Sequence, residues 1–135
     1  MNKIIAAALS LFSLLIPTSA IAQPATTSVT QVQVDKRDLI VVAARAIEDR
    51  KYKLALRVAN NVTDLFPDYA TGYLYRAIAF YKLGELQAAK LDFEKAKKLY
   101  TERSKSANLS ADQKNEAKLG LEAIEIHLKL LKSKV

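Results

Sequence analysis

The chain contains no cysteine and no tryptophan, and it has only one histidine, three glycines and three prolines among 135 residues. Without cysteine it cannot form a disulfide framework, carry a lipid anchor on cysteine or offer thiolate ligands to a metal. His127 alone cannot supply a metal site that needs two histidines. Because glycine and proline are scarce and 50% of the residues are hydrophobic, the composition favours a helical, globular body.

Residues suited to catalysis are also few. Asp92 and Glu94 stand two positions apart on a predicted helix, so their carboxylates point to different sides and make a poor acid–base pair. His127 lies between two apolar residues, which is typical of a structural histidine. No glycine-rich phosphate loop is present. We therefore interpret the chain as a protein without enzymatic activity or cofactor, and a small enzyme is the least favoured of three hypotheses.

The first 22 residues resemble a secretory signal peptide. Lys3 is followed by an apolar run over residues 4–16, which is well short of the ~20 residues that span a bilayer. Pro17 ends this run, and Ala20 and Ala22 supply the small side chains that precede a cleavage site. We predict cleavage after Ala22 and a periplasmic or secreted protein. An uncleaved anchor over residues 4–22 is the alternative.

Residues 23–34 are uncharged and rich in threonine, serine and glutamine, which indicates a flexible linker. The alternative is a segment that adds a strand to a partner's sheet. Removal of Lys3 with the signal segment leaves 20 basic and 14 acidic side chains, a net charge of about +6. No nucleic-acid recognition motif accompanies this charge, so we expect a solvated basic surface and no nucleic-acid partner. The charge leaves room for weak contact with an anionic membrane surface.

Residues 69–100 predict two helices joined by a tight turn at residues 83–85, centred on Gly84. A weaker copy of this hairpin lies 34 residues earlier, with Arg50 at the position of Gly84. In this copy Ala43 is at the position equivalent to Ala77, and Ala55 is at the position equivalent to Ala89. Its two helices are predicted at residues 35–49, capped by Asp35, and at 52–65.

A 34-residue period with small residues between large and aromatic ones resembles the tetratricopeptide repeat. The matching positions of the second copy are Tyr73, Ala77, Phe80, Gly84, Ala89, Phe93 and Ala96. The resemblance covers residues 36–69 and 70–103, about half of the chain. It implies an all-α fold: a short solenoid of two helical hairpins followed by a long C-terminal helix.

Ser110 and Gln113 form a predicted capping box for that final helix, at residues 111–133. The folded domain is therefore predicted at residues 35–133. The helix has two apolar stripes: Ala117, Leu121, Ile124, Leu128 and Leu131, and Leu119, Ala123, Ile126 and Leu130. We expect one stripe to pack on the second hairpin. The other either closes over the concave face or meets another molecule.

The resemblance also implies a binding groove, because the first helix of each tetratricopeptide hairpin lines a concave face. The implied groove residues are Arg37, Ile40, Val41, Ala44, Ile47, Thr71, Leu74, Tyr75, Ile78, Tyr81 and Lys82. Tyr75 and Tyr81 are expected to project from it on similar bearings. The basic clamp with which some family members hold a peptide's terminal carboxylate is missing, since Ile40, Ala44 and Tyr75 take its places.

Besides a small enzyme, two hypotheses remain for the function. The leading one is a non-enzymatic scaffold or adaptor that binds an apolar helix or extended peptide of another protein in this groove. In the second, the protein is a structural subunit that forms homo-oligomers through its C-terminal helix. The alternative for the groove residues is a core that the final helix covers.

Overall fold

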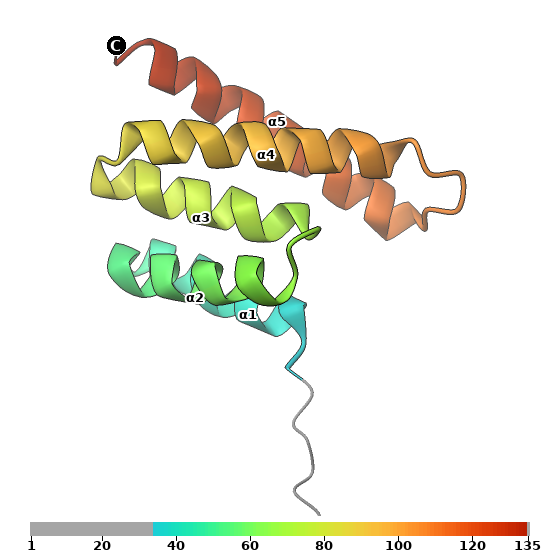
Figure 1. Ribbon diagram of the computed structural model, residues 1–135, viewed down its shortest axis with the longest axis horizontal. Helices are drawn as coiled ribbons and strands as arrows, with labels where there is room; N and C mark the ends of the chain where they lie inside the picture. Colours follow the sequence, from blue (N-terminus) through green and yellow to red (C-terminus); the bar gives the residue numbers. More distant parts are fainter. Residues whose placement is uncertain (1–33, 135) are drawn as a thin grey trace, which may run out of the picture. The chain divides into compact units, whose positions relative to one another are not determined.

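The computed structural model describes residues 34–134, and these form five α-helices (Figure 1). The helices are α1 (Lys36–Glu48), α2 (Tyr52–Leu65), α3 (Ala70–Leu83), α4 (Leu86–Ser104) and α5 (Ala111–Lys132). No β-strand occurs in this part of the chain, so the predicted all-helical class is confirmed for it. None of the five helices is long and apolar enough to cross a membrane. The predicted signal segment and the linker up to residue 33 lie outside the described residues.

Two of the helices begin at capping side chains that the sequence predicts. The carboxylate of Asp35 accepts a hydrogen bond of 2.8 Å from the backbone N–H of Arg37. At the start of α5, the hydroxyl of Ser110 accepts from the backbone N–H of Gln113, whose side chain accepts in return from the N–H of Ser110. These bonds satisfy donors that the first turn of a helix leaves unpaired. Both predicted helix starts are confirmed.

The turns α1–α2 and α3–α4 share one backbone geometry although their sequences differ. Gly84 has a φ angle of +84°, and Arg50, 34 residues earlier, has a φ angle of +59°. The N–H of Lys51 donates to the carbonyl oxygen of Ala46 at 2.8 Å, and the equivalent bond from Glu85 measures 2.9 Å. This bond belongs to the Schellman motif, which ends a helix at a left-handed residue. Arg50 therefore adopts the conformation that favours glycine.

We expect Arg50→Gly to raise the free energy of unfolding by up to about 1 kcal/mol. A left-handed conformation costs a residue with a Cβ atom about 1–2 kcal/mol, and the greater freedom of glycine in the unfolded chain offsets part of the gain. The matched change Gly84→Ala is expected to lower the free energy of unfolding by about 1 kcal/mol. Urea unfolding of both variants measures the two effects. A lower midpoint for Arg50→Gly would contradict the assigned turn geometry.

Equivalent positions of the two hairpins are also buried alike. Four pairs of residues separated by 34 positions have no exposed surface: Ala43 and Ala77, Ala55 and Ala89, Ala59 and Phe93, and Val62 and Ala96. Most of these side chains are small, which lets the two helices of each hairpin approach closely. The hairpins α1–α2 and α3–α4 are thus buried alike at these four pairs of positions.

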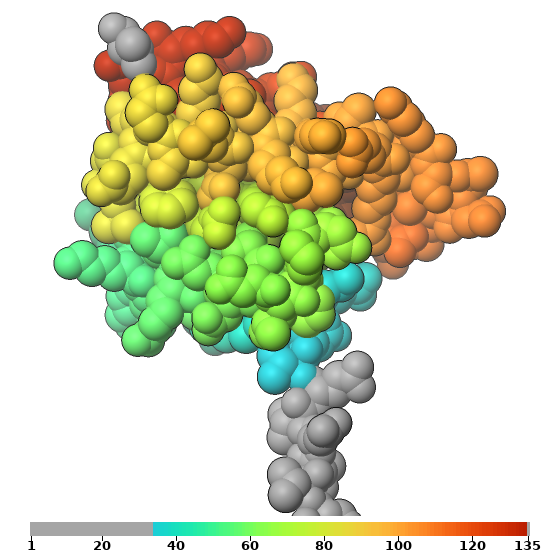
Figure 2. Space-filling model, in the orientation of Figure 1, coloured from blue at the N-terminus to red at the C-terminus, as the bar shows by residue number. Residues whose placement is uncertain are grey.

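Each helix packs mainly on the next helix in the chain. Further contacts join α1 with α3 and α3 with α5, whereas the backbones of α2 and α4 do not approach each other. In Figure 1, α1 lies behind α2 and α5 lies behind α4. On the near face in the same orientation, side chains fill the spaces between α2, α3 and α4 (Figure 2). The odd-numbered helices therefore form one layer, and α2 and α4 pack on it.

The largest hydrophobic cluster lies between α3, α4 and α5, and Phe93 and Ile124 are fully buried in it. Ala117 and Leu131 of α5 belong to the same cluster, and Leu121 and Leu128 pack against it. The first predicted stripe of α5 thus packs on the second hairpin, as expected. Two smaller clusters lie between α1, α2 and α3.

The contact between α4 and α5 requires glycine at position 120. A Cβ atom on Gly120 would lie 2.5 Å from two ring carbons of Tyr100, far inside van der Waals distance. The Tyr100 ring is buried, so it has little space into which to move. The absence of a side chain at Gly120 therefore lets α5 pack directly on this ring.

Candidate functional site

The predicted groove is only partly open in the structure. Arg37, Val41 and Lys82 are exposed, Ala44, Ile47, Tyr75, Ile78 and Tyr81 are half-buried, and Ile40, Thr71 and Leu74 are buried. Ile40 packs with Val62 and Tyr69 in one of the smaller clusters. The buried members contribute to the core and leave the exposed and half-buried ones as the candidate binding surface.

Tyr75 and Tyr81 do not project on similar bearings, so this expectation is wrong. Six residues of α-helix turn through about 600°, which leaves about 120° between the two side chains. Tyr75 packs beside Ile40, whereas Tyr81 packs against the large cluster of α3, α4 and α5. The ring of Tyr81 meets the edge of His127, with centroids 5.8 Å apart, and the ammonium of Lys134 lies 4.5 Å from its centroid. The final helix and the residues after it therefore cover the Tyr81 end of the groove.

The open part of the groove lies on α1 and the facing side of α3. Val41 is 57% exposed, and Ala44 and Tyr75 are half-buried. Burial, together with the negative charge of Glu48, raises the pKa of the Tyr75 phenol above its ordinary value. Tyr75 is consequently neutral at physiological pH. It offers an apolar ring and a hydroxyl next to an acidic group, a combination that is common at protein interfaces.

Thr71 ties α3 to α4 and α5 by hydrogen bonds. Its hydroxyl donates to a carboxylate oxygen of Glu116 at 2.6 Å, which leaves the hydroxyl of Tyr100 as the donor to Thr71 at 2.8 Å. Burial raises the pKa of the Tyr100 phenol, and the nearby charge of Glu116 raises it further. The hydroxyl of Thr71, a residue of the predicted groove, therefore already has its hydrogen-bond partners within the chain.

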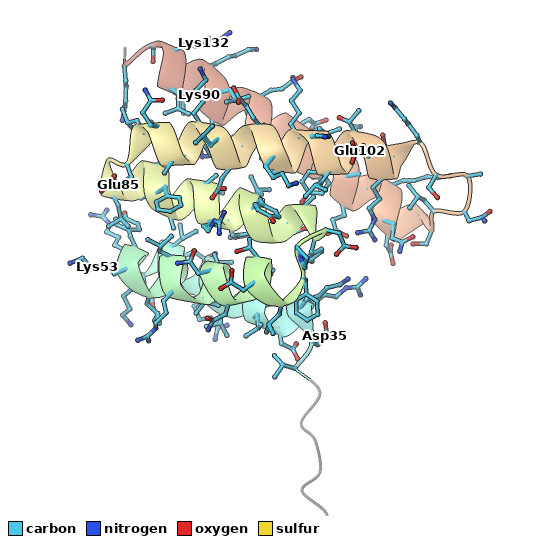
Figure 3. The ribbon with its side chains drawn as sticks, in the orientation of Figure 1. Asp35, Lys53, Glu85, Lys90, Glu102 and Lys132 are labelled. Carbon is cyan, nitrogen blue, oxygen red and sulfur yellow. The ribbon has the colours of Figure 1, made fainter. Side chains whose placement is uncertain are left out.

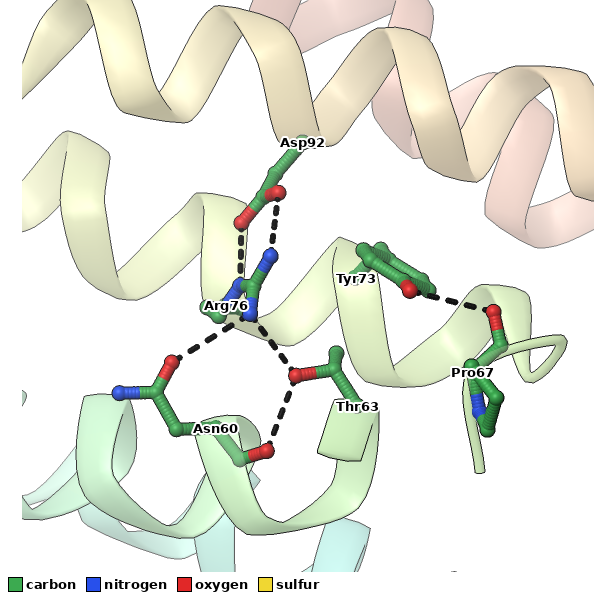
Figure 4. Close-up of polar contacts among 6 residues, drawn as sticks. All are labelled: Asn60, Thr63, Pro67, Tyr73, Arg76 and Asp92. Atoms are coloured by element: carbon green, nitrogen blue, oxygen red, sulfur yellow. Dashed lines mark hydrogen bonds and ion pairs between the residues drawn. The ribbon is translucent and has the colours of Figure 1, made fainter. Parts of the chain in front are cut away.

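Arg76 joins three helices through a network that was not predicted from the sequence (Figure 4). Its Nε and Nη2 donate to the two carboxylate oxygens of Asp92 at 2.6 and 2.8 Å, and its Nη1 donates to the hydroxyl of Thr63 at 2.8 Å. The hydrogen bond to Asp92 raises the pKa of the guanidinium. The 34-residue alignment held a signal for this pair, because the equivalent positions are the apolar Val42 and Val58.

Asp92 is therefore a structural partner of Arg76, and Glu94, two residues later, is exposed. His127 is half-buried, and its ring stacks on Phe93 with centroids 5.0 Å apart. Its Nδ1 lies 2.8 Å from the carbonyl oxygen of Ala123. No group of three or more metal-ligating side chains comes together within residues 34–134.

A cleft of about 590 Å³ lies between α4 and the last turns of α5. Its apolar wall includes Leu86, Leu128 and Leu131, and its rim carries Lys90, Lys97 and Lys132 together with Glu94. Figure 3 shows Lys90 on α4 and Lys132 near the end of α5. This cleft is separate from the predicted groove and was not expected from the sequence.

Exposed large apolar side chains gather on the first hairpin and the last helix. They are Val34, Val41, Val42 and Leu65 at one end, Leu119, Ile126 and Leu130 at the other, and Leu91 on α4. Val34 and Leu65 border a shallow hollow of about 330 Å³, together with Leu39. The second predicted stripe of α5 is therefore exposed and does not close over the groove.

The sequence was also compared with known proteins. No protein family matches it, and no curated protein shows significant similarity to it.

Proposed function

We propose that the chain is a non-enzymatic protein-binding module, built from two tetratricopeptide-like hairpins and a closing helix, that acts after export from the cytoplasm. The partner is a protein whose apolar helix or extended segment binds on the open part of the groove, between α1 and α3.

The repeat assignment is supported by features that recur at a spacing of 34 residues. The turns at Arg50 and Gly84 have the same left-handed geometry, and four pairs of equivalent positions are fully buried. Contacts between alternate helices of one layer are what a stack of hairpins requires, because each hairpin packs only on its neighbours. Such a stack buries a continuous core and presents one face of its first helices.

The observation that carries the binding role is the exposure of Val41 on the face of α1 that also holds Ala44 and Glu48. An isoleucine, leucine or valine on a surface needs no explanation when it stands alone. Val41, however, lies one turn before the half-buried Ala44 and one turn after the basic Arg37, and the charge of Glu48 on the same face acts on the phenol of Tyr75. A helix in a groove is recognised by apolar anchors at such positions, and tyrosine and arginine are the residues enriched in them.

The test compares capture of envelope proteins by the immobilised protein and by four variants. Val41→Glu and Tyr75→Ala are expected to reduce the retained partner at least about tenfold, because loss of an interface anchor typically costs 1.4 kcal/mol or more. Leu91→Glu is the matched control, since Leu91 is 67% exposed but lies on α4, away from the groove. Tyr81→Ala is expected to lower thermal stability more than capture, because α5 covers that ring.

Equal loss of capture in Leu91→Glu and Val41→Glu would mean that the groove has no special role. Retention of the same proteins by all variants would place binding on another surface. Circular dichroism of each variant checks that the helices are intact.

A further inference from the structure

The last helix carries an apolar stripe that no part of the described chain covers. Leu119, Ile126 and Leu130 are exposed and Ala123 is half-buried. These positions are separated by four, three and four residues, the alternation that forms the contact line of a coiled coil. Since each residue turns a helix by about 100°, the four side chains lie within an arc of about 60°.

The two flanks of this stripe differ. On one flank, Gly120 is buried against Tyr100, and His127 stacks on Phe93, so this side faces the chain's own core. On the other flank, Glu122 and Lys129 are exposed. Neither takes part in an ion pair within residues 34–134.

We propose that a second copy of this chain binds the stripe with its own α5 in the antiparallel direction. In this register Leu119 meets Leu130 of the second copy, and Ala123 meets Ile126 of the second copy. The two-fold axis passes between positions 124 and 125, so the same two contacts are made twice. Each large side chain then faces either another large one or the small Ala123, and the stripe is complementary to itself. A two-fold interface has this property, because one patch serves both subunits.

The charges on the exposed flank favour the same direction. In the antiparallel pair, Glu122 lies beside Lys129 of the second copy, and symmetry repeats this contact of opposite charges. A parallel pair would instead bring the exposed flank of one helix to the inner flank of the other. That inner flank holds Gly120 and His127, which offer no carboxylate or ammonium group to Glu122 and Lys129, whereas in the antiparallel pair the two charged flanks face each other. Among the described residues α5 packs only on α3 and α4, which leaves its outer face open to this contact (Figure 1).

The contact line is short, with four positions over about 16 Å of helix. Interfaces of this size are at the low end for specific complexes. We therefore expect a reversible dimer with a dissociation constant in the range of roughly 1–100 µM, which is sensitive to single substitutions. The dimer uses a surface separate from the groove on α1 and α3, so it does not rest on the proposed binding function.

Sedimentation equilibrium of the purified protein at concentrations across this range tests the proposal. The wild-type mass is expected to rise from one copy to two and to stop there. Ile126→Glu places two carboxylates in the centre of the contact and should give a monomer at every concentration. The control Leu91→Glu adds the same charge at an exposed leucine outside the stripe and should leave the dimer unchanged.

Charge reversal tests the register. Glu122→Lys and Lys129→Glu each convert two attractions into two repulsions, and each should raise the dissociation constant about tenfold. The double variant Glu122→Lys with Lys129→Glu restores both attractions and should recover wild-type dimerisation. A double variant that is as weak as the single ones would overturn the antiparallel register.

The absence of cysteine allows the direction to be tested by cross-linking. A chain with Leu119→Cys and Leu130→Cys should form a disulfide-linked dimer on mild oxidation, whereas Leu119→Cys alone should not. In a parallel pair, Leu119→Cys alone would cross-link. A wild-type protein that stays monomeric through the whole range would overturn the proposal. So would a mass that grows beyond two copies and is reduced by Val42→Glu, since it would indicate head-to-tail stacking on the first hairpin.

Discussion

Arg76→Ala is expected to lower the free energy of unfolding by about 3 kcal/mol. Removing one partner of a buried ion pair typically costs 3–5 kcal/mol, because the other charge is left in a poorly solvated site. The side chains of Arg76 and Asp92 are 22% and 10% exposed, so solvent screens the pair slightly and the lower value applies. The substitution also removes the hydrogen bonds that Arg76 donates to Thr63 and Asn60 on α2. Urea unfolding followed by circular dichroism measures the change.

The first hairpin supplies the control for this prediction. Its residues at the two equivalent positions are Val42 and Val58, which carry no charge. The double variant Arg76→Val with Asp92→Val is expected to be more stable than Arg76→Ala, because no buried charge remains unpaired. Lys98→Ala, which breaks an exposed pair with Glu102 at 3.9 Å, should change stability by less than about 0.5 kcal/mol. A loss for Arg76→Ala as small as that of Lys98→Ala would show that the network contributes little.

Phe93→Ala is expected to cost about 3–5 kcal/mol, the range for truncating a fully buried aromatic ring. Phe93 has no exposed surface and belongs to the cluster that α3, α4 and α5 share. Its ring also stacks on His127 at 5.0 Å, so truncation removes a contact between α4 and α5. The cavity forms where the final helix joins the second hairpin. Thermal and urea unfolding should both show the loss.

The equivalent residue of the first hairpin is Ala59, which is equally buried. Alanine is therefore compatible with this position in the repeat, and the expected loss at Phe93 comes from the neighbours that pack on the ring. Phe93→Leu fills most of the space and should cost less, about 1 kcal/mol. Leu91→Ala, at a 67% exposed position of the same helix, should change stability by no more than about 0.5 kcal/mol. Equal effects at positions 91 and 93 would contradict the packing of α4.

Local interactions made the helices predictable from the sequence. The ends of α1 and α5 follow from Asp35 and Ser110, whose bonds reach only two or three residues along the chain. The turn at Gly84 and the 34-residue spacing of buried small residues could also be predicted from the sequence. The left-handed geometry at Arg50 could not, because the sequence aligns Arg50 with Gly84 but a residue with a Cβ atom rarely adopts this conformation.

The candidate sites depend on contacts between residues that are far apart in the sequence. Thr71 and Glu116 are 45 residues apart, and Arg76 and Asp92 are 16 apart, so neither contact follows from the periodicity of one helix. The sequence predicted two apolar stripes on α5 and could not say which would be covered. The structure buries the stripe of Ile124 and exposes that of Ile126, because Gly120 lets one side of α5 pack on Tyr100. The sequence therefore determined the helices, the caps of α1 and α5 and the turn at Gly84. The tertiary packing of α5 decided that the Tyr81 end of the groove is covered and that an apolar stripe faces solvent.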